Sequence, residues 1–446
     1  MSLWIPRLRH QFEAARARRS ALAAVSDGER QQRQLLALQE TWADAVADVP
    51  YFAALVERQQ APPVIHTWDD VRAIPVLTRQ ALQDQPSAFV RRSGPPGSIM
   101  KTAGSTGTPI QIGMNQAERD LMRIVKLAAW QEMGYQPDSR LFIMWGHVHL
   151  LGSGVTRAVN TAKRSVADRM LGYRRVNAYR LNPEICAQFA EQLIAHRPIG
   201  FISYASALDL FGRYTASYRE RFRGLGLRFV LATTEPPPRP DTVSMLEDLF
   251  GCPVVQEYGG GEFGQVAFKK GSGPFEVYGD LDYVETEAPA ADDPESHPVL
   301  ITALYRRYVP LIRYRLGDGL SEPHQLPNGH VDRFAAVAGR LNDVIQLPGG
   351  DAIHSLSIFH CVHDEASVFN IQMVLRDEGI ELRLVSPGVD HAALESRIRP
   401  RLARVHPALA QARFTYVDDV GATRAGKRRW FIDERTSPAC AASPAS

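Results

Sequence analysis

The chain has 446 residues, which is too long for one compact core and indicates a large domain with a smaller one. Its 51 lysines and arginines against 49 acidic residues leave a formal net charge of +2, so the composition gives no support to nucleic-acid binding. No apolar run approaches the ~20 residues that span a bilayer, so we expect no membrane partner. The four scattered cysteines form no Cys-x-x-Cys pair, which favours a cytoplasmic protein.

The first part of the chain is predicted to be helical, and an α/β layer follows it. Residues 3–46 are rich in Ala, Arg, Gln and Leu at helical spacing, whereas the Pro-rich segment 62–98 is expected to wrap the surface. Between residues 140 and 305, short apolar runs alternate with amphipathic ones. We predict strands at 141–145, 199–204, 227–233 and 253–256, and helices at 183–196, 206–220 and 241–250. This alternation indicates an α/β fold with mainly parallel strands.

The pattern changes after residue 339 and predicts a small α+β domain. Strands are expected at 367–375, 379–386 and 412–417, with a helix at 391–405. We therefore divide the chain into a large N-terminal domain over residues 1–338, a small domain over 339–435 and a disordered tail over 436–446.

A glycine-rich segment between the helical lobe and the α/β layer is a candidate phosphate cradle. Residues 101–109 read Lys-Thr-Ala-Gly-Ser-Thr-Gly-Thr-Pro. The glycines let backbone N–H groups turn toward an anion, and the hydroxyl groups can donate to phosphate oxygens. The residues concerned are Gly104, Ser105, Thr106, Gly107 and Thr108. An ordinary turn is the alternative interpretation, and the segment lacks the Gly-Lys-Ser/Thr end of a Walker loop.

Four further motifs follow in a fixed order. They are Tyr258-Gly-Gly-Gly-Glu262, Arg313-Tyr-Arg-Leu-Gly-Asp318, Gly339-Arg340-Leu-Asn-Asp343 and Arg-Ala-Gly-Lys427. Together with the glycine-rich segment, they resemble the adenylate-forming superfamily of acyl-CoA synthetases, nonribosomal-peptide adenylation domains and luciferases. Within it, the chain is most similar to the phenylacetate-CoA ligase family and its capsule-biosynthesis-type relatives. The likeness extends over residues 100–435.

The resemblance implies a nucleotide site with ATP and Mg²⁺. A hard cation seeks a carboxylate at a strand end, which makes Glu262 the candidate metal ligand. An ionised carboxylate can accept from both ribose hydroxyls, which suits Asp318. The remaining implied contacts are Tyr258 and Gly259 with the nucleotide, Glu235 on the adenine side, Arg340 with ribose or phosphate, and Lys427 with the α-phosphate and the reacting carboxylate. Solvated loops and turns are the alternative interpretation of Glu262, Asp318 and Lys427.

The sequence gives less information about the acid pocket than about the nucleotide site. His147, Tyr204 and Gly260 fall at or near predicted strand ends, although a lone histidine is more often structural. Glycines at 259 and 260 would leave room for a planar or bulky acid. The chain departs from the family pattern at Thr108, Gly261 and Leu316, and the missing hydroxyl at 261 removes one phosphate donor.

We therefore expect an AMP-forming ligase that adenylates a carboxylic acid, preferably an aromatic one, and passes the acyl group to coenzyme A after the small domain rotates. One alternative is an adenylate-forming enzyme that delivers the acyl group to an amine or hydroxyl, or transfers AMP itself. Another is a catalytically degenerate nucleotide-binding protein. A homodimer is left open.

Overall fold

The computed structural model describes most of the chain. The described residues are 6–94, 97–101, 111–146, 154–178, 180–278, 281–289, 294–338, 344–347, 351–354, 357–358, 361–362, 365, 367–368, 370–386, 388–418 and 431–435.

The N-terminal lobe is helical, as predicted. Its elements are α1 (Pro6–Ala23), α2 (Asp27–Asp48), α3 (Pro50–Glu57), α4 (Trp68–Ala73), α5 (Arg79–Asp84) and the 3₁₀ turn η1 (Pro86–Phe89). Ser26 and Glu29 form a capping box that fixes the start of α2. The Pro-rich segment does more than wrap the surface, because Val71, Leu82 and Phe89 are buried in a core shared with α2 and α3. That expectation was therefore incomplete.

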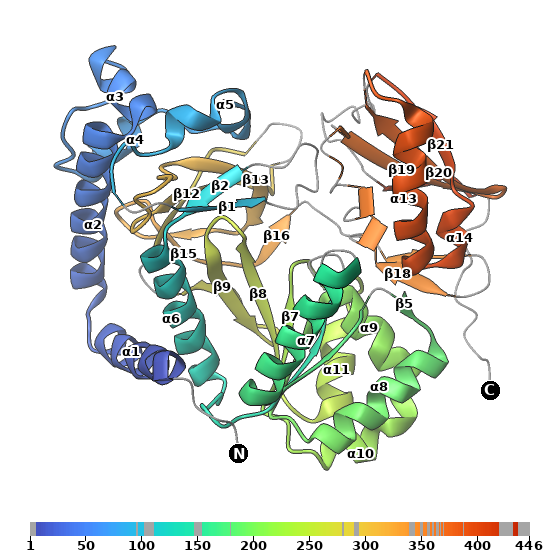
Figure 1. Ribbon diagram of the computed structural model, residues 1–446. Helices are drawn as coiled ribbons and strands as arrows, with labels where there is room; N and C mark the ends of the chain where they lie inside the picture. Colours follow the sequence, from blue (N-terminus) through green and yellow to red (C-terminus); the bar gives the residue numbers. More distant parts are fainter. Residues whose placement is uncertain are drawn as a thin grey trace.

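A nine-stranded sheet forms the centre of the molecule (Figure 1). Its order is β14-β15-β10-β9-β8-β7-β6-β3-β4, and the run from β4 to β8 is parallel, as the sequence predicted. The strands are β3 (Leu141–Met144), β4 (Tyr173–Val176), β6 (Gly200–Tyr204), β7 (Phe229–Thr233), β8 (Val254–Gly260), β9 (Gly264–Lys270), β10 (Phe275–Val277), β14 (His324–Gln325) and β15 (Val331–Phe334).

Helices cover both faces of this sheet. The helices between the strands are α7 (Gly154–Leu171), α8 (Pro183–His196), α9 (Ala205–Tyr214), η3 (Ala216–Tyr218), α10 (Arg219–Arg223) and α11 (Thr242–Phe250). Residues of α8, α9 and α11 pack on one face, while α6 (Gln116–Glu132) packs on the other. The single helix predicted at 206–220 is wrong in detail, because this segment is divided into α9, η3 and the start of α10.

Two smaller sheets adjoin the central one. A hairpin of β1 (Ser98–Lys101) and β2 (Gln111–Met114) brackets the glycine-rich segment. A four-stranded antiparallel sheet contains β11 (Asp282–Thr286), β12 (His297–Ala303), β13 (Tyr314–Ser321) and β16 (Ala336–Ala338). This sheet shares its apolar core with the N-terminal helices.

The C-terminal part has its own apolar core, drawn from residues 345–412. Its strands are β19 (Asn370–Arg376), β20 (Gly379–Val385), β21 (Arg413–Tyr416) and β22 (Phe431–Asp433), packed with α13 (His391–Val405) and α14 (Pro407–Ala410). Strands β17 (Val344–Gln346) and β18 (Ala352–His354) form a third small sheet with β5 (Arg180–Leu181), which belongs to the large part of the chain (Figure 1).

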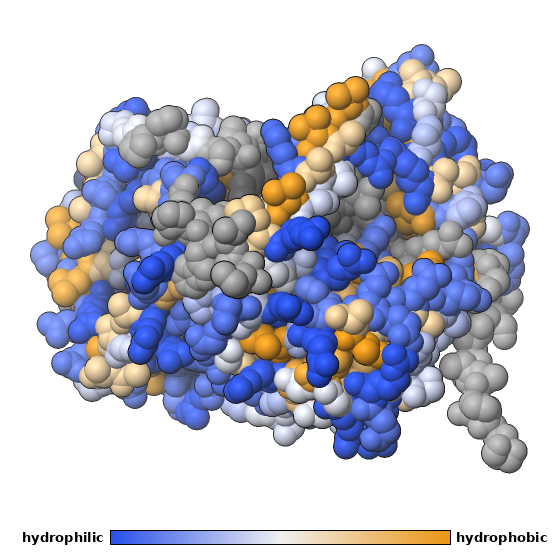
Figure 2. All heavy atoms as spheres, turned by 60° about the horizontal axis from the view of Figure 1, so that its bottom comes forward, coloured by the Kyte–Doolittle hydropathy of each residue, from blue (hydrophilic) through white to orange (hydrophobic). Residues whose placement is uncertain are grey.

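Polar side chains dominate the face of the molecule shown in Figure 2. The large apolar side chains that are exposed among the described residues are Leu36, Val64, Val155, Val159 and Val166, and three of these lie on α7. Within the described residues, no helix combines the length and the apolar character that a membrane span requires.

Candidate functional site

The candidate site lies where the parallel strands end. Tyr204 is the last residue of β6, Thr233 the last of β7, and the two are paired in register. Glu257 of β8 is paired in turn with Thr233. In an open parallel sheet, ligands bind beyond the carboxyl ends of the strands. The edge formed by β3, β6, β7 and β8 is therefore the expected ligand side of the sheet.

Two residues predicted to hold the nucleotide meet at this edge. The Tyr258 hydroxyl donates to Asp318 Oδ2 over 3.2 Å, although the two residues lie on β8 and β13 of different sheets. Both are nearly buried, with 8% and 9% of their surfaces exposed. The Tyr258 ring packs edge-on against Phe334 with the ring centroids 5.8 Å apart. A hydrogen bond to a buried carboxylate holds both side chains in place.

The Tyr-Gly-Gly-Gly-Glu segment is a hairpin rather than a loop after a strand. Tyr258, Gly259 and Gly260 lie inside β8, which turns through residues 261–263 into the antiparallel β9. A Cβ atom at Gly259 would lie 2.0 Å from the Gly264 carbonyl oxygen. The prediction that Gly259 leaves room for an acid is therefore wrong, because the backbone of the hairpin fills that space. At Gly260 a Cβ atom would lie 3.0 Å from Glu262 Oε2.

Glu262 lies in the turn of this hairpin. Its carboxylate forms no hydrogen bond or ion pair within the described part of the chain, whereas its carbonyl oxygen accepts from Arg306 Nη1. Arg306 Nη2 donates over 2.7 Å to the Gly113 carbonyl of β2. Arg306 therefore ties the turn that carries Glu262 to the strand after the glycine-rich segment.

The sequence prediction missed this arginine. Burial lowers the pKa of Arg306 to about 10, while the carboxylates of Glu118, Glu262 and Asp282 oppose the shift. Nothing in the local pattern marks Arg306, because its partners lie far away in sequence. Glu118 could have been found, since Asn115 and Glu118 form a capping box at the start of α6. Glu118 also accepts from the backbone N–H groups of residues 307 and 308, over 2.6 and 2.8 Å.

Glu235 and Tyr204 are buried, and both form hydrogen bonds within the protein. Glu235 accepts from the Ser206 backbone N–H over 2.9 Å and from the Ser206 hydroxyl, so it holds the start of α9. Only 2% of the Tyr204 surface is exposed. Its ring stacks on the Trp145 ring with the centroids 4.1 Å apart, and its hydroxyl accepts from the Gly146 N–H over 3.4 Å. Burial raises the pKa of Tyr204, so its phenol stays neutral.

The other predicted site residues lie outside the described residues. They are Gly104, Ser105, Thr106, Gly107, Thr108, His147, Arg340 and Lys427. The predicted tail at 436–446 also lies outside them. The roles of these residues stay predictions.

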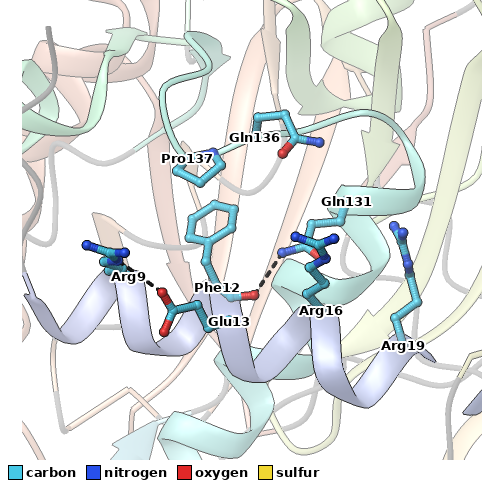
Figure 3. Close-up of a pocket in the computed structure, with 8 residues that line it drawn as sticks. All are labelled: Arg9, Phe12, Glu13, Arg16, Arg19, Gln131, Gln136 and Pro137. Atoms are coloured by element: carbon cyan, nitrogen blue, oxygen red, sulfur yellow. Dashed lines mark hydrogen bonds and ion pairs between the residues drawn. The ribbon is translucent and has the colours of Figure 1, made fainter. Parts of the chain in front are cut away.

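A pocket of about 720 Å³ lies elsewhere, between α1 and the end of α6 (Figure 3). It is lined by Arg9, Phe12, Glu13, Arg16, Arg19, Gln131, Gln136 and Pro137. The side chains of Arg9 and Glu13 pair with each other over 2.9 Å, and Gln131 donates to the Phe12 carbonyl over 3.1 Å. None of the predicted site residues lines this groove, and its charged side chains face solvent. We therefore place the site at the strand ends.

Comparison with known proteins connects this architecture to a ligase fold. A structure of 2-hydroxyisobutyryl-CoA ligase in complex with 2-HIB-AMP and CoA, in the thioesterification state, matches with a TM-score of 0.58. The match covers 92% of this chain and 91% of that one at 19% identity. The chain has the fold of an acyl-CoA ligase. This fold is the one that the resemblance noted in the sequence implies.

Two further matches are weaker. A structure of the same ligase in the postadenylation state with 2-HIB-AMP gives a TM-score of 0.54 at 19% identity, covering 92% of this chain and 90% of that one. Protein CapK of Staphylococcus aureus is 21% identical over 267 residues, and the match spans 58% of each protein. No model of a known protein family matches the sequence.

Proposed function

We propose that this chain is an ATP-dependent, AMP-forming ligase that activates a carboxylic acid and passes the acyl group to coenzyme A. The observation that carries the proposal is the meeting of Tyr258 and Asp318 at the strand ends of an acyl-CoA ligase fold. The motif order in the sequence had assigned these two residues to one nucleotide.

In the proposed reaction, a carboxylate oxygen of the acid attacks the α-phosphorus of ATP, and the bond to pyrophosphate breaks. The thiol of coenzyme A then attacks the acyl carbon, and AMP leaves. Asp318 would accept from the ribose hydroxyls, while Tyr258 holds the Asp318 carboxylate in position. Lys427 and Arg340 would offset negative charge as the two anions approach each other, because fixed cations act most strongly where charge develops.

The residues present fit a Mg²⁺ ion beside Glu262. Its carboxylate has no hydrogen bond or ion pair within the described part of the chain and is therefore available to a cation. The described residues contain no cluster of three metal-ligating side chains. Mg²⁺ usually takes one or two carboxylates and completes its shell with phosphate oxygens and water, which agrees with a single glutamate. When bound, the ion would neutralise phosphate charge.

The resemblance to phenylacetate-CoA ligases favours an aromatic acid. The test is a pyrophosphate-exchange screen over a panel of carboxylic acids, followed by product analysis with and without coenzyme A. We expect acid-dependent exchange of labelled pyrophosphate into ATP and a thioester when coenzyme A is added. Release of ADP and phosphate with the best acid would rule out the AMP-forming reaction. Transfer of the acyl group to an amine or hydroxyl instead would support adenylation but show that coenzyme A is not the acceptor.

A further inference from the structure

Two half-buried residues of opposite charge, Glu257 and Lys126, lie on the α6 side of the strand ends, and the proposed function has not used them. Glu257 is the residue before Tyr258 on β8, so its side chain points to the opposite face of the sheet. Two residues earlier, Val255 packs in the apolar layer between the sheet and α6. Lys126 comes from α6 and interacts electrostatically with Glu257, and its ammonium group lies 4.5 Å from the centre of the Trp130 ring.

Apolar side chains lie around this pair, although Thr233 and Gln265 act on Glu257, and Arg123 and Arg175 act on Lys126. Leu127, Trp130, Leu231, Val255 and Phe268 form the layer in which it sits. Burial raises the pKa of the Glu257 carboxyl, and the same cause lowers the pKa of the Lys126 ammonium. Removing two charges from water costs several kcal/mol per ion, and attraction between them offsets only part of that cost. The packing of this layer does not require such a pair, so the pair is a candidate for a functional role.

The Glu257 carboxylate is only partly satisfied. Its Oε1 atom accepts from the Thr233 hydroxyl over 2.7 Å, and the Gln265 side chain helps to lower the pKa of the carboxyl. Its Oε2 atom has less than 1 Å² of accessible surface and no hydrogen-bond partner of good geometry within the described residues. A buried acceptor without a donor costs about 1–3 kcal/mol, more for a charged group.

We propose that Glu257 and Lys126 form the polar floor of the acid pocket, and that the acid carries a hydroxyl or amino group that donates to Glu257 Oε2. This inference rests on the proposed function and narrows its substrate class. Glu257 adjoins Tyr258 in the chain, so an acid whose carboxylate lies at the nucleotide would extend its other end along the α6 face of the same strand ends. An acid without a donor would cover the charged pair without satisfying it.

The test compares acids that match in size but differ in one donor. Pyrophosphate exchange is measured with 4-hydroxybenzoate against 4-methylbenzoate, and with 3-hydroxybutyrate against 3-methylbutyrate. A site built around a hydrogen bond strongly rejects an analogue that lacks the donor. We expect at least one hydroxy acid to exceed its methyl partner about 100-fold or more in kcat/KM, by the same principle.

Two variants connect that preference to the pair. Glu257→Gln keeps the shape but can turn a donor toward the ligand, and we expect it to reduce the hydroxyl preference at least tenfold. The double variant Glu257→Leu with Lys126→Met removes both charges together, which avoids an unpaired buried ion. It should accept the methyl acid as well as the hydroxy acid. Glu276→Gln, an exposed glutamate on β10 of the same sheet, is the matched control and should leave the preference unchanged.

Three results would overturn the inference while leaving adenylation intact. They are exchange without any hydroxyl preference, a preference that survives in the double variant, and an equal loss for both acids of a pair in Glu257→Gln. The last result would mean that the pair only stabilises the fold. No exchange with any acid would overturn the proposed function, and the inference with it.

Discussion

Glu262 differs from the other acidic residues of the site because its carboxylate forms no hydrogen bond or ion pair with a described residue, whereas Glu235 and Asp318 are buried and hydrogen-bonded. Glu262→Gln keeps the shape of the side chain and removes its charge. We expect pyrophosphate exchange to fall at least about 100-fold, or about 3 kcal/mol of barrier, because the variant loses the proposed metal ligand. Thermal melting should change little, since the carboxylate forms no hydrogen bond or ion pair with the described residues and acts on Arg306 only electrostatically.

The matched control is Glu276→Gln, which lies on an exposed strand position. Exchange should be measured over a range of Mg²⁺ concentrations, because a weakened metal site needs more of the ion. Native exchange by a folded Glu262→Gln variant would remove this residue from the metal site.

Tyr258 and Asp318 share a hydrogen bond, so two variants are needed to separate ribose binding by Asp318 from the positioning of Asp318 by Tyr258. Asp318→Ala removes the predicted ribose acceptor, so the variant should no longer prefer ATP to 2′-deoxy-ATP. Tyr258→Phe removes only the hydroxyl that holds Asp318, so it should weaken ATP binding by about 0.5–1.5 kcal/mol and keep the preference. The measurement is the KM of each variant for ATP and for 2′-deoxy-ATP. Full discrimination by Asp318→Ala would contradict the ribose assignment.

At the scale of elements, sequence periodicity predicted most helices and strands well. The helices at 183–196 and 391–405 have the predicted bounds, and Asn182 and Asp390 cap their first turns. The strand predicted at 253–256 ended before Tyr258. β8 instead continues to Gly260, since pairing with β9 is a tertiary contact that local composition does not report.

Local sequence also gave little information about which residues of the site lie close together. The family resemblance, rather than the spacing, assigned Tyr258 and Asp318 to one nucleotide, and the two side chains are hydrogen-bonded to each other. Arg306 escaped notice because it acts on backbone carbonyl groups of Gly113 and Glu262, which carry no side-chain signature. Glu257 escaped notice because one charged residue inside a strand does not reveal which face it occupies.

The β8–β9 hairpin gives a prediction at this scale. A Cβ atom at Gly259 would lie 2.0 Å from the Gly264 carbonyl oxygen, so Gly259→Ala must push the two strands apart. Overpacking of this kind costs about 1–3 kcal/mol. We expect a lower melting temperature and a loss of exchange activity, because the displaced turn carries Glu262.

Gly28→Ala is the control, since a Cβ atom there would meet nothing within 4 Å and the residue lies in α2. Alanine favours a helix over glycine, so this variant should be neutral or slightly more stable. Equal melting temperatures for the two variants would show that the hairpin can relax around the added methyl group.

At the scale of the whole molecule, the C-terminal part is connected to the rest by a strand pair. The last strand of the large part is β16, which ends at Ala338, and the separate C-terminal core begins at Ile345. These observations support the domain boundary that we propose after residue 338. Strand β18 nevertheless pairs across this boundary with β5, through Ala352 with Leu181 and Ile353 with Arg180. If the small domain rotates between the two half-reactions, this pairing must open.

A disulfide across the pair tests that motion. Paired residues on antiparallel strands have Cα atoms about 4.5–5.5 Å apart, which is within reach of a disulfide. Leu181→Cys with Ala352→Cys, in a chain that also carries Cys440→Ser, would place one oxidisable pair at the junction. The remaining cysteines are buried, and burial raises the pKa of Cys186 and Cys252 to about 12, so they compete little for oxidation.

We expect the oxidised variant to retain one half-reaction and to lose the other by orders of magnitude, because a fixed domain can place Lys427 for only one of them. Pyrophosphate exchange measures the first half-reaction, and conversion of a supplied acyl-adenylate with coenzyme A measures the second. Reduction should restore the lost step, which separates locking from damage by the substitutions. If the oxidised enzyme performs both steps at the rate of the reduced enzyme, β5 and β18 stay paired throughout the cycle, and any rotation must occur elsewhere in the chain.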